Sequence, residues 1–251
     1  MKKIVKRFIP LFVLVSFVLF WHIASKIVGN PLFVPSPTET LKMFFQLVSE
    51  GNLLKHAISS FMRITMAVSL GGVIAIPLAM LISQVKSVEV LLNPVLGFLK
   101  YIPITAFSPI LMLIQGIGED MKITLIFIAV FLQFLPILIN LFSDVDIRIL
   151  ETAQSMGLSR LRMIGLVIAP YTLPEVLRNL ITQYGIGWTY VIIAEVTNAN
   201  WGLGHLMYVG SARGNTPMVF AALFTIIIIN TVFDKVGIKI VKKLFPWRYK
   251  K

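Results

Sequence analysis

One polar stretch interrupts a chain that is otherwise strongly apolar: residues 143–175, which read SDVDIRILETAQSMGLSRLRMIGLVIAPYTLPE. Seven of its side chains are charged, and charged groups are costly in the hydrocarbon core of a bilayer. The stretch is therefore expected to leave the membrane. Of all 251 residues, 57% are hydrophobic and only 14% are charged, a balance that excludes an ordinary soluble domain.

Capping signals predict a short helix in the first half of this stretch. Ser143 has a side chain suited to an N-cap, and Asp144 and Asp146 follow it in the turn where the helix dipole favours negative charge. Gly157 tolerates the left-handed backbone at a helix end and is expected to terminate this helix.

The second half predicts another short helix, which returns the chain to the membrane. Ser159 is placed to cap residues 160–168, and Pro170, which has no backbone N–H, is expected to end them. Thr172 and Glu175 have the spacing of a capping box at the start of the next span. The stretch is thus predicted to form two short helices across a glycine corner on the membrane surface.

The apolar remainder of the chain predicts an all-α membrane protein with six transmembrane helices. A bilayer core needs about 20 apolar residues per helix, which leaves no room for a separate soluble catalytic domain. Gly71 and Gly72 are expected to permit close helix approach. Three prolines, Pro103 among them, predict a broken third span, and Pro136 an interruption of the fourth. The spans are expected near residues 8–24, 57–82, 91–115, 123–142, 173–196 and 218–235.

The chain outside the central spans divides into smaller segments. Residues 1–28 have the basic start and apolar core of a signal peptide, but a poor cleavage site and their length favour a retained span. Residues 29–56 hold a proline-rich extended segment and an amphipathic helix over 38–49, expected on the outer membrane surface. Residues 57–240 form the transmembrane domain, and residues 241–251 form a basic cytoplasmic tail.

The distribution of charge orients the chain in the membrane. A net charge of +12 would suit nucleic acid, but 17 of the 23 Lys and Arg residues fall on one side if both termini are cytoplasmic. This asymmetry follows the positive-inside rule, so we predict no nucleic-acid partner. The same topology places residues 143–175 on the cytoplasmic side.

This polar stretch resembles the signature loop of ABC-importer permease subunits. The resemblance lies in Glu151-Thr152-Ala153, in Gly157, and in the run over residues 167–170. Three positions differ mildly from the family pattern: Thr152, Val167 and Ala169. The wider chain is similar to the branch that imports nitrate, bicarbonate, taurine, aliphatic sulfonates and some vitamin precursors.

The resemblance implies a permease subunit of an importer in a bacterial-type cytoplasmic (inner) membrane, working by alternating access on a small anionic solute. A pyrimidine or flavin precursor is the alternative substrate. The implied partners are two copies of an ATPase subunit, a second permease copy in a homodimer, and an extracytoplasmic solute-binding protein. The residues implied in coupling to the ATPase are Glu151, Thr152, Ala153, Met156, Gly157, Leu158 and Pro170.

Further candidates in or beside the spans belong to a substrate pathway or gate. Arg63 and Glu195 are expected near the outer ends of their spans, either as a structural ion pair or as an anion-attracting group and a gate. Trp188 lies deep enough to line a pathway, whereas glutamines either contact solute or bond across helices. The six candidates are Arg63, Pro103, Gln115, Gln133, Trp188 and Glu195.

Other functions are disfavoured by what the sequence lacks. It has no cysteine, and its three histidines share no ligand spacing, so no metal site is expected. It has no glycine-rich phosphate loop, so ATP and magnesium are expected to bind to the partner ATPase subunit. It has no nucleophile–histidine–acid pattern, so no catalytic residue is expected on this chain. The alternative is a stand-alone channel or secondary transporter, which would need an internal repeat or mid-membrane carboxylates.

Overall fold

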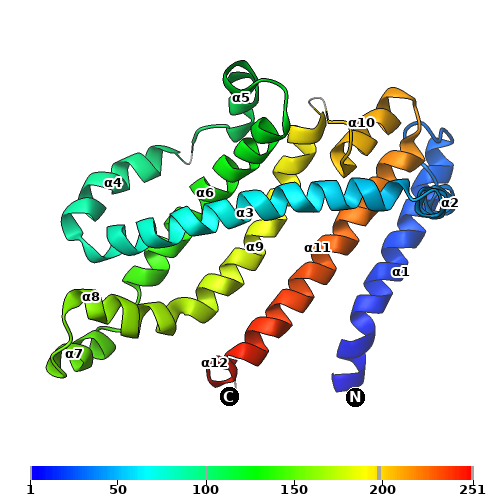
Figure 1. The fold of residues 1–251 in the computed structure, drawn as a ribbon. Helices are drawn as coiled ribbons and strands as arrows, with labels where there is room; N and C mark the ends of the chain where they lie inside the picture. The colour runs from blue at the N-terminus through cyan, green and yellow to red at the C-terminus, as the bar shows by residue number, and fades with distance from the viewer. Residues whose placement is uncertain (1, 100, 197–198, 250–251) are drawn as a thin grey trace. The chain divides into compact units, whose positions relative to one another are not determined.

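The computed structural model describes residues 2–99, 101–196 and 199–249, and the regular elements in these ranges are all helices (Figure 1). They fall into two compact units. The first unit comprises Met1–Ser59 and Glu195–Ile227, and the second comprises Ser60–Ala194 and Ile228–Lys251. The helices are α1 (Lys2–Val28), α2 (Pro37–Ser49), α3 (Asn52–Gln84), α4 (Lys86–Leu99), η1 (Ile104–Ala106), α5 (Phe107–Gln115), α6 (Glu119–Ser143), α7 (Ile147–Ser155), α8 (Arg160–Met163), η2 (Ile164–Ile168), α9 (Ala169–Val196), α10 (Leu203–Ala212), α11 (Thr216–Leu244) and α12 (Pro246–Tyr249).

Four helical segments in the described ranges are long and apolar enough to cross a bilayer: α3, α6, the run from η2 through α9, and α11. The pair α4 and α5 is bent by 78° and makes a fifth if it counts as one span. The all-α membrane class is therefore confirmed, and so is the break in the predicted third span. The apolar part of α1, Phe12–Val28, is shorter, so its role as a sixth span stays a prediction.

Three long helices, α3, α6 and α9, pack closely in the second unit. A Cβ added to Gly71 of α3 would stand 3.1 Å from Val130 Cγ1 of α6, and one at Gly72 would stand 3.2 Å from Leu180 Cδ1 of α9. The predicted close approach at these glycines is confirmed. The interruption predicted at Pro136 is wrong, because α6 is continuous there. A proline removes one backbone bond, and the remaining turns of a long packed helix keep theirs.

In the first unit, aromatic stacking joins α1 to α11. The Trp21 ring lies 5.7 Å from that of Phe220 and 5.3 Å from that of Phe224, measured between centroids. The amphipathic helix predicted over residues 38–49 is present as α2, with a capping box between Ser36 and Glu39. Most of its predicted apolar face points away from the unit, since Leu41, Phe45 and Val48 are exposed.

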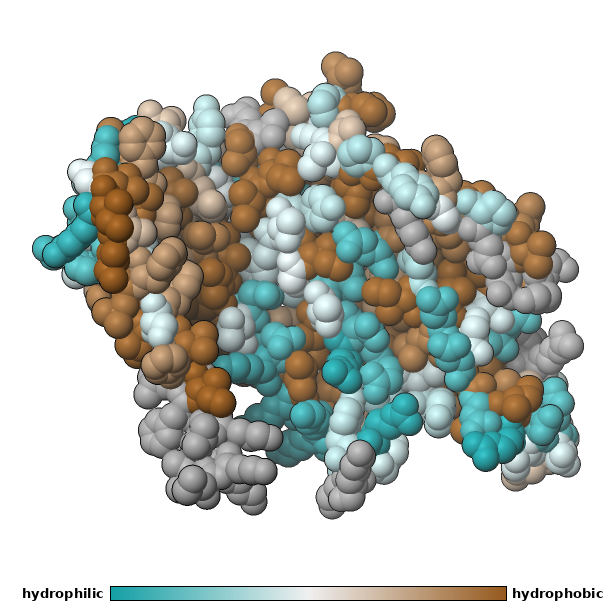
Figure 2. Space-filling view, turned by 180° about the vertical axis from the view of Figure 1, so that it is seen from behind, coloured by the Kyte–Doolittle hydropathy of each residue, from teal (hydrophilic) through white to brown (hydrophobic). Residues whose placement is uncertain are grey.

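Large apolar side chains are exposed along the candidate spans. On α1, Phe12 and Phe20 are 72% and 70% exposed, and on α3, Val73 is 72% exposed. Apolar side chains also cover broad areas of the face drawn in Figure 2. Soluble monomers rarely expose so much contiguous apolar surface, so this exposure fits a chain surrounded by lipid.

The contact between α9 and α3 yields a test of the packing. A Cβ at Gly187 would stand 2.6 Å from Ile64 Cγ2, whereas one at Gly97 of α4 would meet no atom within 4 Å. We expect Gly187→Ala to destabilise the protein by about 1–3 kcal/mol through overpacking. Gly97→Ala should leave stability unchanged or raise it, since alanine favours helix. Thermal unfolding of both variants in detergent checks this, and equal melting temperatures would contradict the packing.

Candidate functional site

The loop between α6 and α9 begins with a turn after a helix that is longer than predicted. α6 runs to Ser143, so the prediction that this residue caps the next helix is wrong. Phe142 and Val145 are buried in the core of the second unit, and their packing extends α6 past the expected end. Asp146 is the N-cap of α7 instead, with its Oδ1 accepting a hydrogen bond from the Arg148 N–H at 3.0 Å.

Asp146 and Arg148 also form an exposed ion pair, with 2.5 Å between Oδ2 and Nη2. Hydrogen bonds from the Arg148 side chain, and then from its backbone, hold the pKa of Asp146 below its usual value. The cap is therefore charged at all but strongly acid pH, and a negative charge at a helix N-terminus is favourable.

Gly157 ends α7, as predicted. Its φ is +80°, a conformation that side chains with a Cβ rarely adopt. The Leu158 N–H donates to the Ala153 carbonyl at 3.2 Å, and the Gly157 N–H donates to the Gln154 carbonyl at 2.9 Å. These two bonds define a Schellman motif. A Cβ at Gly157 would meet no atom within 4 Å, so backbone conformation and not space selects glycine.

The predicted coupling residues divide into an exposed and a buried group. Ala153 is only 4% exposed and packs against its own chain, and Leu158 is half-buried. Pro170 is exposed at the start of α9. Four residues at the end of α7 and its corner, which we call the α7 surface, are exposed: Glu151, Thr152, Met156 and Gly157.

The second short helix does not end at Pro170, contrary to the prediction. α8 continues through the π-helical turn η2 into α9, and the Ala169 N–H donates to the Ile164 carbonyl five residues earlier. Pro170 then lies inside a continuous helical run, directly after the π-helical turn. The capping box predicted at Thr172 is also wrong, because its hydroxyl donates back to the Ile168 carbonyl at 2.7 Å.

The C-terminal helix α12 contacts the start of α9. Arg248 Nε lies 3.8 Å from Glu175 Oε1, and the Arg248 guanidinium lies 5.5 Å from the centre of the Tyr171 ring. α7, α8 and α12 thus lie at one end of the second unit, and α5 lies at the other (Figure 1). The predicted tail extends to residues 250–251, which lie outside the described residues. Lys100, one of the 17 basic residues assigned to the cytoplasmic side, also lies outside them.

Arg63 belongs to a charge network at the start of α6. Its Nε and Nη2 atoms contact the two carboxylate oxygens of Glu119 at 2.5 and 2.8 Å, and Lys122 Nζ contacts the same carboxylate at 3.0 Å. Arg63 and Lys122 are only 6% and 4% exposed, so Glu119 neutralises part of a buried positive charge. A pair between Arg63 and Glu195 would join the two units and stays a prediction.

Glu195 lies in the first unit, where its buried carboxylate holds the start of α10. Its Oε2 accepts a hydrogen bond from the Gly204 N–H at 2.8 Å. A Cβ at Gly202 would collide with this carboxylate, so space selects glycine here. The φ of Gly202 is +145°, so backbone conformation selects glycine as well. The sequence interpretation missed α10 altogether. The glycine before Leu203 and Leu206 was a signal for a helix start.

Two predicted pathway residues share one groove in the second unit. Pro103 and Gln133 line a groove of about 490 Å³, together with Asn140 and Tyr190. The other glutamine of the prediction, Gln115, is exposed at the end of α5 and does not line this groove.

Trp188 is buried rather than open to a pathway. It is 3% exposed, and its indole N–H has no hydrogen-bond partner among the described residues. Gln183, on the same helix, is fully buried and likewise unpartnered within the described chain. Neither residue lines the groove that Pro103 and Gln133 share.

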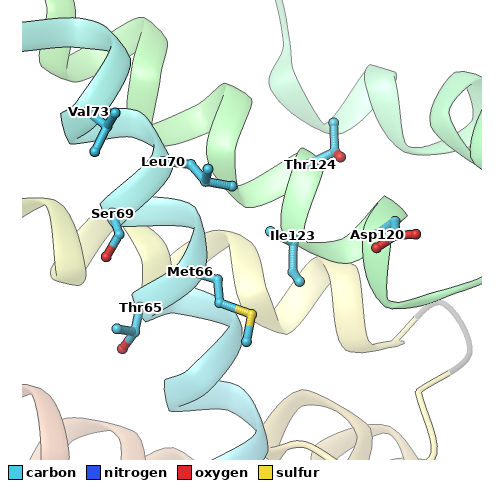
Figure 3. A pocket seen from close by; sticks show the side chains of 8 residues that line it. All are labelled: Thr65, Met66, Ser69, Leu70, Val73, Asp120, Ile123 and Thr124. Atoms are coloured by element: carbon cyan, nitrogen blue, oxygen red, sulfur yellow. The ribbon is translucent and has the colours of Figure 1, made fainter.

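A second groove, of about 550 Å³, lies between α3 and α6 and was not predicted (Figure 3). Its polar residues follow a spacing of four, which places each pair on one helix face. That spacing was the signal available in the sequence. The polar residues are Thr65 and Ser69 on α3, and Asp120 and Thr124 on α6.

Comparison with known proteins identifies the family. The family described as "Binding-protein-dependent transport system inner membrane component" matches residues 68–237. The chain belongs to that family. It is thus a component of a transport system in the inner membrane, and its several apolar helices agree with a multi-pass membrane protein.

Similar proteins carry different substrate names. The chain is 29% identical to the taurine transport system permease protein TauC of Escherichia coli, covering 90% of this chain and 84% of that one. It is 28% identical to the putative aliphatic sulfonates transport permease protein SsuC of Bacillus subtilis (86% and 78%) and to the riboflavin transport system permease protein RibX of Chloroflexus aurantiacus (86% and 81%).

A solved structure shares the fold. A chain of the MetNI methionine ABC transporter, in inward-facing conformations, matches with a TM-score of 0.68 at 16% identity, covering 78% of this chain and 97% of that one. An all-α membrane fold of this kind is therefore established for the larger part of the chain.

The capping of α7 yields a prediction for exchange measurements. Asp146→Ala removes the N-cap acceptor, whereas Asp146→Asn keeps one. We expect hydrogen–deuterium exchange in α7 to become several-fold faster in the alanine variant, and to stay near wild type in the asparagine variant. Unchanged protection of α7 in the alanine variant would rule out the assigned cap.

The pH dependence of that protection follows from the lowered pKa of Asp146. A carboxyl group whose pKa is lowered by folding contributes fully above its usual value of about 3.9. The contribution is lost as the pH falls through the folded-state pKa. Protection of α7, corrected for intrinsic exchange, should therefore decline at acid pH in the wild type. In Asp146→Asn, which has no carboxyl group at this position to protonate, this decline should be absent.

Proposed function

We propose that this chain is the transmembrane permease subunit of an ATP-driven ABC importer, and that its loop between α6 and α9 docks on a separate ATPase subunit. The observation that carries the proposal is the α7 surface. It is an exposed, polar corner whose backbone is fixed at both ends, by the Asp146 cap and by the Schellman motif at Gly157. A rigid protruding corner suits docking to a partner better than a mobile loop does.

The mechanism that we propose is alternating access. ATP binding and hydrolysis on the partner move the α7 surface, and the spans shift between inward-facing and outward-facing populations. The differential free energy comes from the partner, because this chain has no glycine-rich phosphate loop. Two permease copies surround the pathway, each docked on one ATPase copy, and an extracytoplasmic binding protein delivers the solute.

The orientation that we propose has both termini in the cytoplasm. The lysines and arginines concentrate on that side, as the positive-inside rule requires. The contact of Arg248 with Glu175 supports this arrangement, since it places the basic tail at the same end of the second unit as the α7 surface.

The substrate class that we propose is a small organic sulfonate. The names of the permeases from Escherichia coli and Bacillus subtilis, taurine and aliphatic sulfonates, support this choice. The similarity to a riboflavin transport permease keeps a vitamin-type solute as the alternative.

A charge reversal on the α7 surface tests the docking. Glu151→Lys changes an exposed acid on α7, and Glu50→Lys makes the same change at the exposed end of α2 in the first unit. We expect Glu151→Lys to abolish co-purification of the ATPase, or to cut solute-stimulated ATP hydrolysis at least tenfold, with membrane insertion unchanged. Glu50→Lys should behave like wild type.

Two outcomes would overturn the proposal. Purification of the wild-type chain as an active oligomer with no ATPase would favour a channel or secondary transporter. Full coupling in Glu151→Lys would exclude the α7 surface as the docking site.

A further inference from the structure

The groove lined by Pro103 and Gln133 has polar groups at membrane depth. Gln133 and Asn140 are seven residues apart on α6, so they share a face about 10 Å apart along the helix. Tyr190 of α9 lines the same groove, whose volume of about 490 Å³ is ample for a small organic solute.

These three side chains have no hydrogen-bond partner in the described part of the chain. Gln133 and Asn140 are exposed, and Tyr190 is half-buried. An amide or hydroxyl group facing hydrocarbon without a partner is costly, so helices usually turn such groups toward protein, water or ligand. The groove is therefore expected to face protein or an aqueous space and not lipid.

The broken span supplies a second, independent observation. The groove wall includes Leu99, Pro103 and Ile104, at the corner where the chain bends by 78° between α4 and α5. Irregular backbone at membrane depth is tolerated where protein buries it or where it lines a water-filled cavity. In many secondary transporters, broken helices of this kind lie beside the solute site.

We propose that this groove is a solute-binding subsite of the transport pathway, and that it takes a small solute carrying a singly charged oxyanion of the sulfonate type. The amides of Gln133 and Asn140 and the hydroxyl of Tyr190 donate hydrogen bonds to the oxyanion. The described lining holds no charged side chain. Binding is therefore weak enough for release. A dianion or a cation would find no counter-charge in the described lining. This inference rests on the proposed importer function.

Cysteine labelling tests whether the groove is aqueous. The chain has no native cysteine, so Gln133→Cys and Asn140→Cys each create a single reactive site. Ile228→Cys, on an exposed apolar position of α11, is the matched control for a lipid-facing residue. We expect the charged sulfonate reagent methanethiosulfonate ethylsulfonate to label both groove variants in the complete transporter, and to label Ile228→Cys at least tenfold more slowly.

Protection by solute tests whether the groove binds the proposed class. Taurine at millimolar concentration should slow labelling of Gln133→Cys several-fold, while choline and phosphate should not. Labelling as slow as that of Ile228→Cys, or labelling that taurine leaves unchanged, would overturn the proposal.

Transport assays separate this inference from the proposed function. In proteoliposomes holding the permease, its ATPase and its binding protein, Gln133→Leu and Tyr190→Phe should lower uptake of radiolabelled taurine at least tenfold. Thr182→Val, an exposed position of α9 outside the groove, should not. If the wild type hydrolyses ATP under control of its binding protein but moves no sulfonate, the solute class is wrong and the importer stands. If the wild type recruits no ATPase at all, the importer itself fails.

Discussion

The hydrocarbon core of a bilayer offers no hydrogen-bond partner to a backbone N–H or C=O group, and most features of this chain follow from that constraint. The spans must be helices, and they pack closely where Gly71 and Gly72 remove the side chain between them. Charged stretches must leave the membrane, and residues 144–163 lie between two candidate spans, where they can do so. A break in a span, such as the corner near Pro103, must find protein or water beside it.

The same constraint explains why polar side chains inside the spans are few and specifically placed. Glu119 binds Arg63 and Lys122 together, because two buried cations need a shared counter-charge. Glu195 belongs to α9, and its buried carboxylate lies at the start of α10, where backbone N–H groups need an acceptor. Such groups have a structural use within their own unit. Gln133 has no such partner in the described chain, which makes it the stronger candidate for contact with solute.

Patterns that depend on neighbouring residues in sequence were predictable, and those that depend on packing were not. Spans, the glycine contacts and the end of α7 at Gly157 follow from local composition and backbone preference. The hydroxyl of Ser143 suggested an N-cap, but Phe142 is buried in the core and α6 includes Ser143 as its last residue. Pro170 suggested a helix end, but the π-helical turn before it carries the helix onward. The partner of Arg63, Glu119, lies 56 residues away in sequence, where no spacing rule reaches.

The proposed docking surface and the proposed groove share two helices, and this gives them a physical connection. α6 ends at Ser143, ten residues after Gln133, so the groove lies about 15 Å along a continuous helix from the loop. α9 leaves the same loop and carries Tyr190 on the other wall. A displacement of the α7 surface by a partner would move both walls through stiff helices. Their relative movement would widen or narrow the groove, so no long chain of side-chain contacts is needed to couple the two sites.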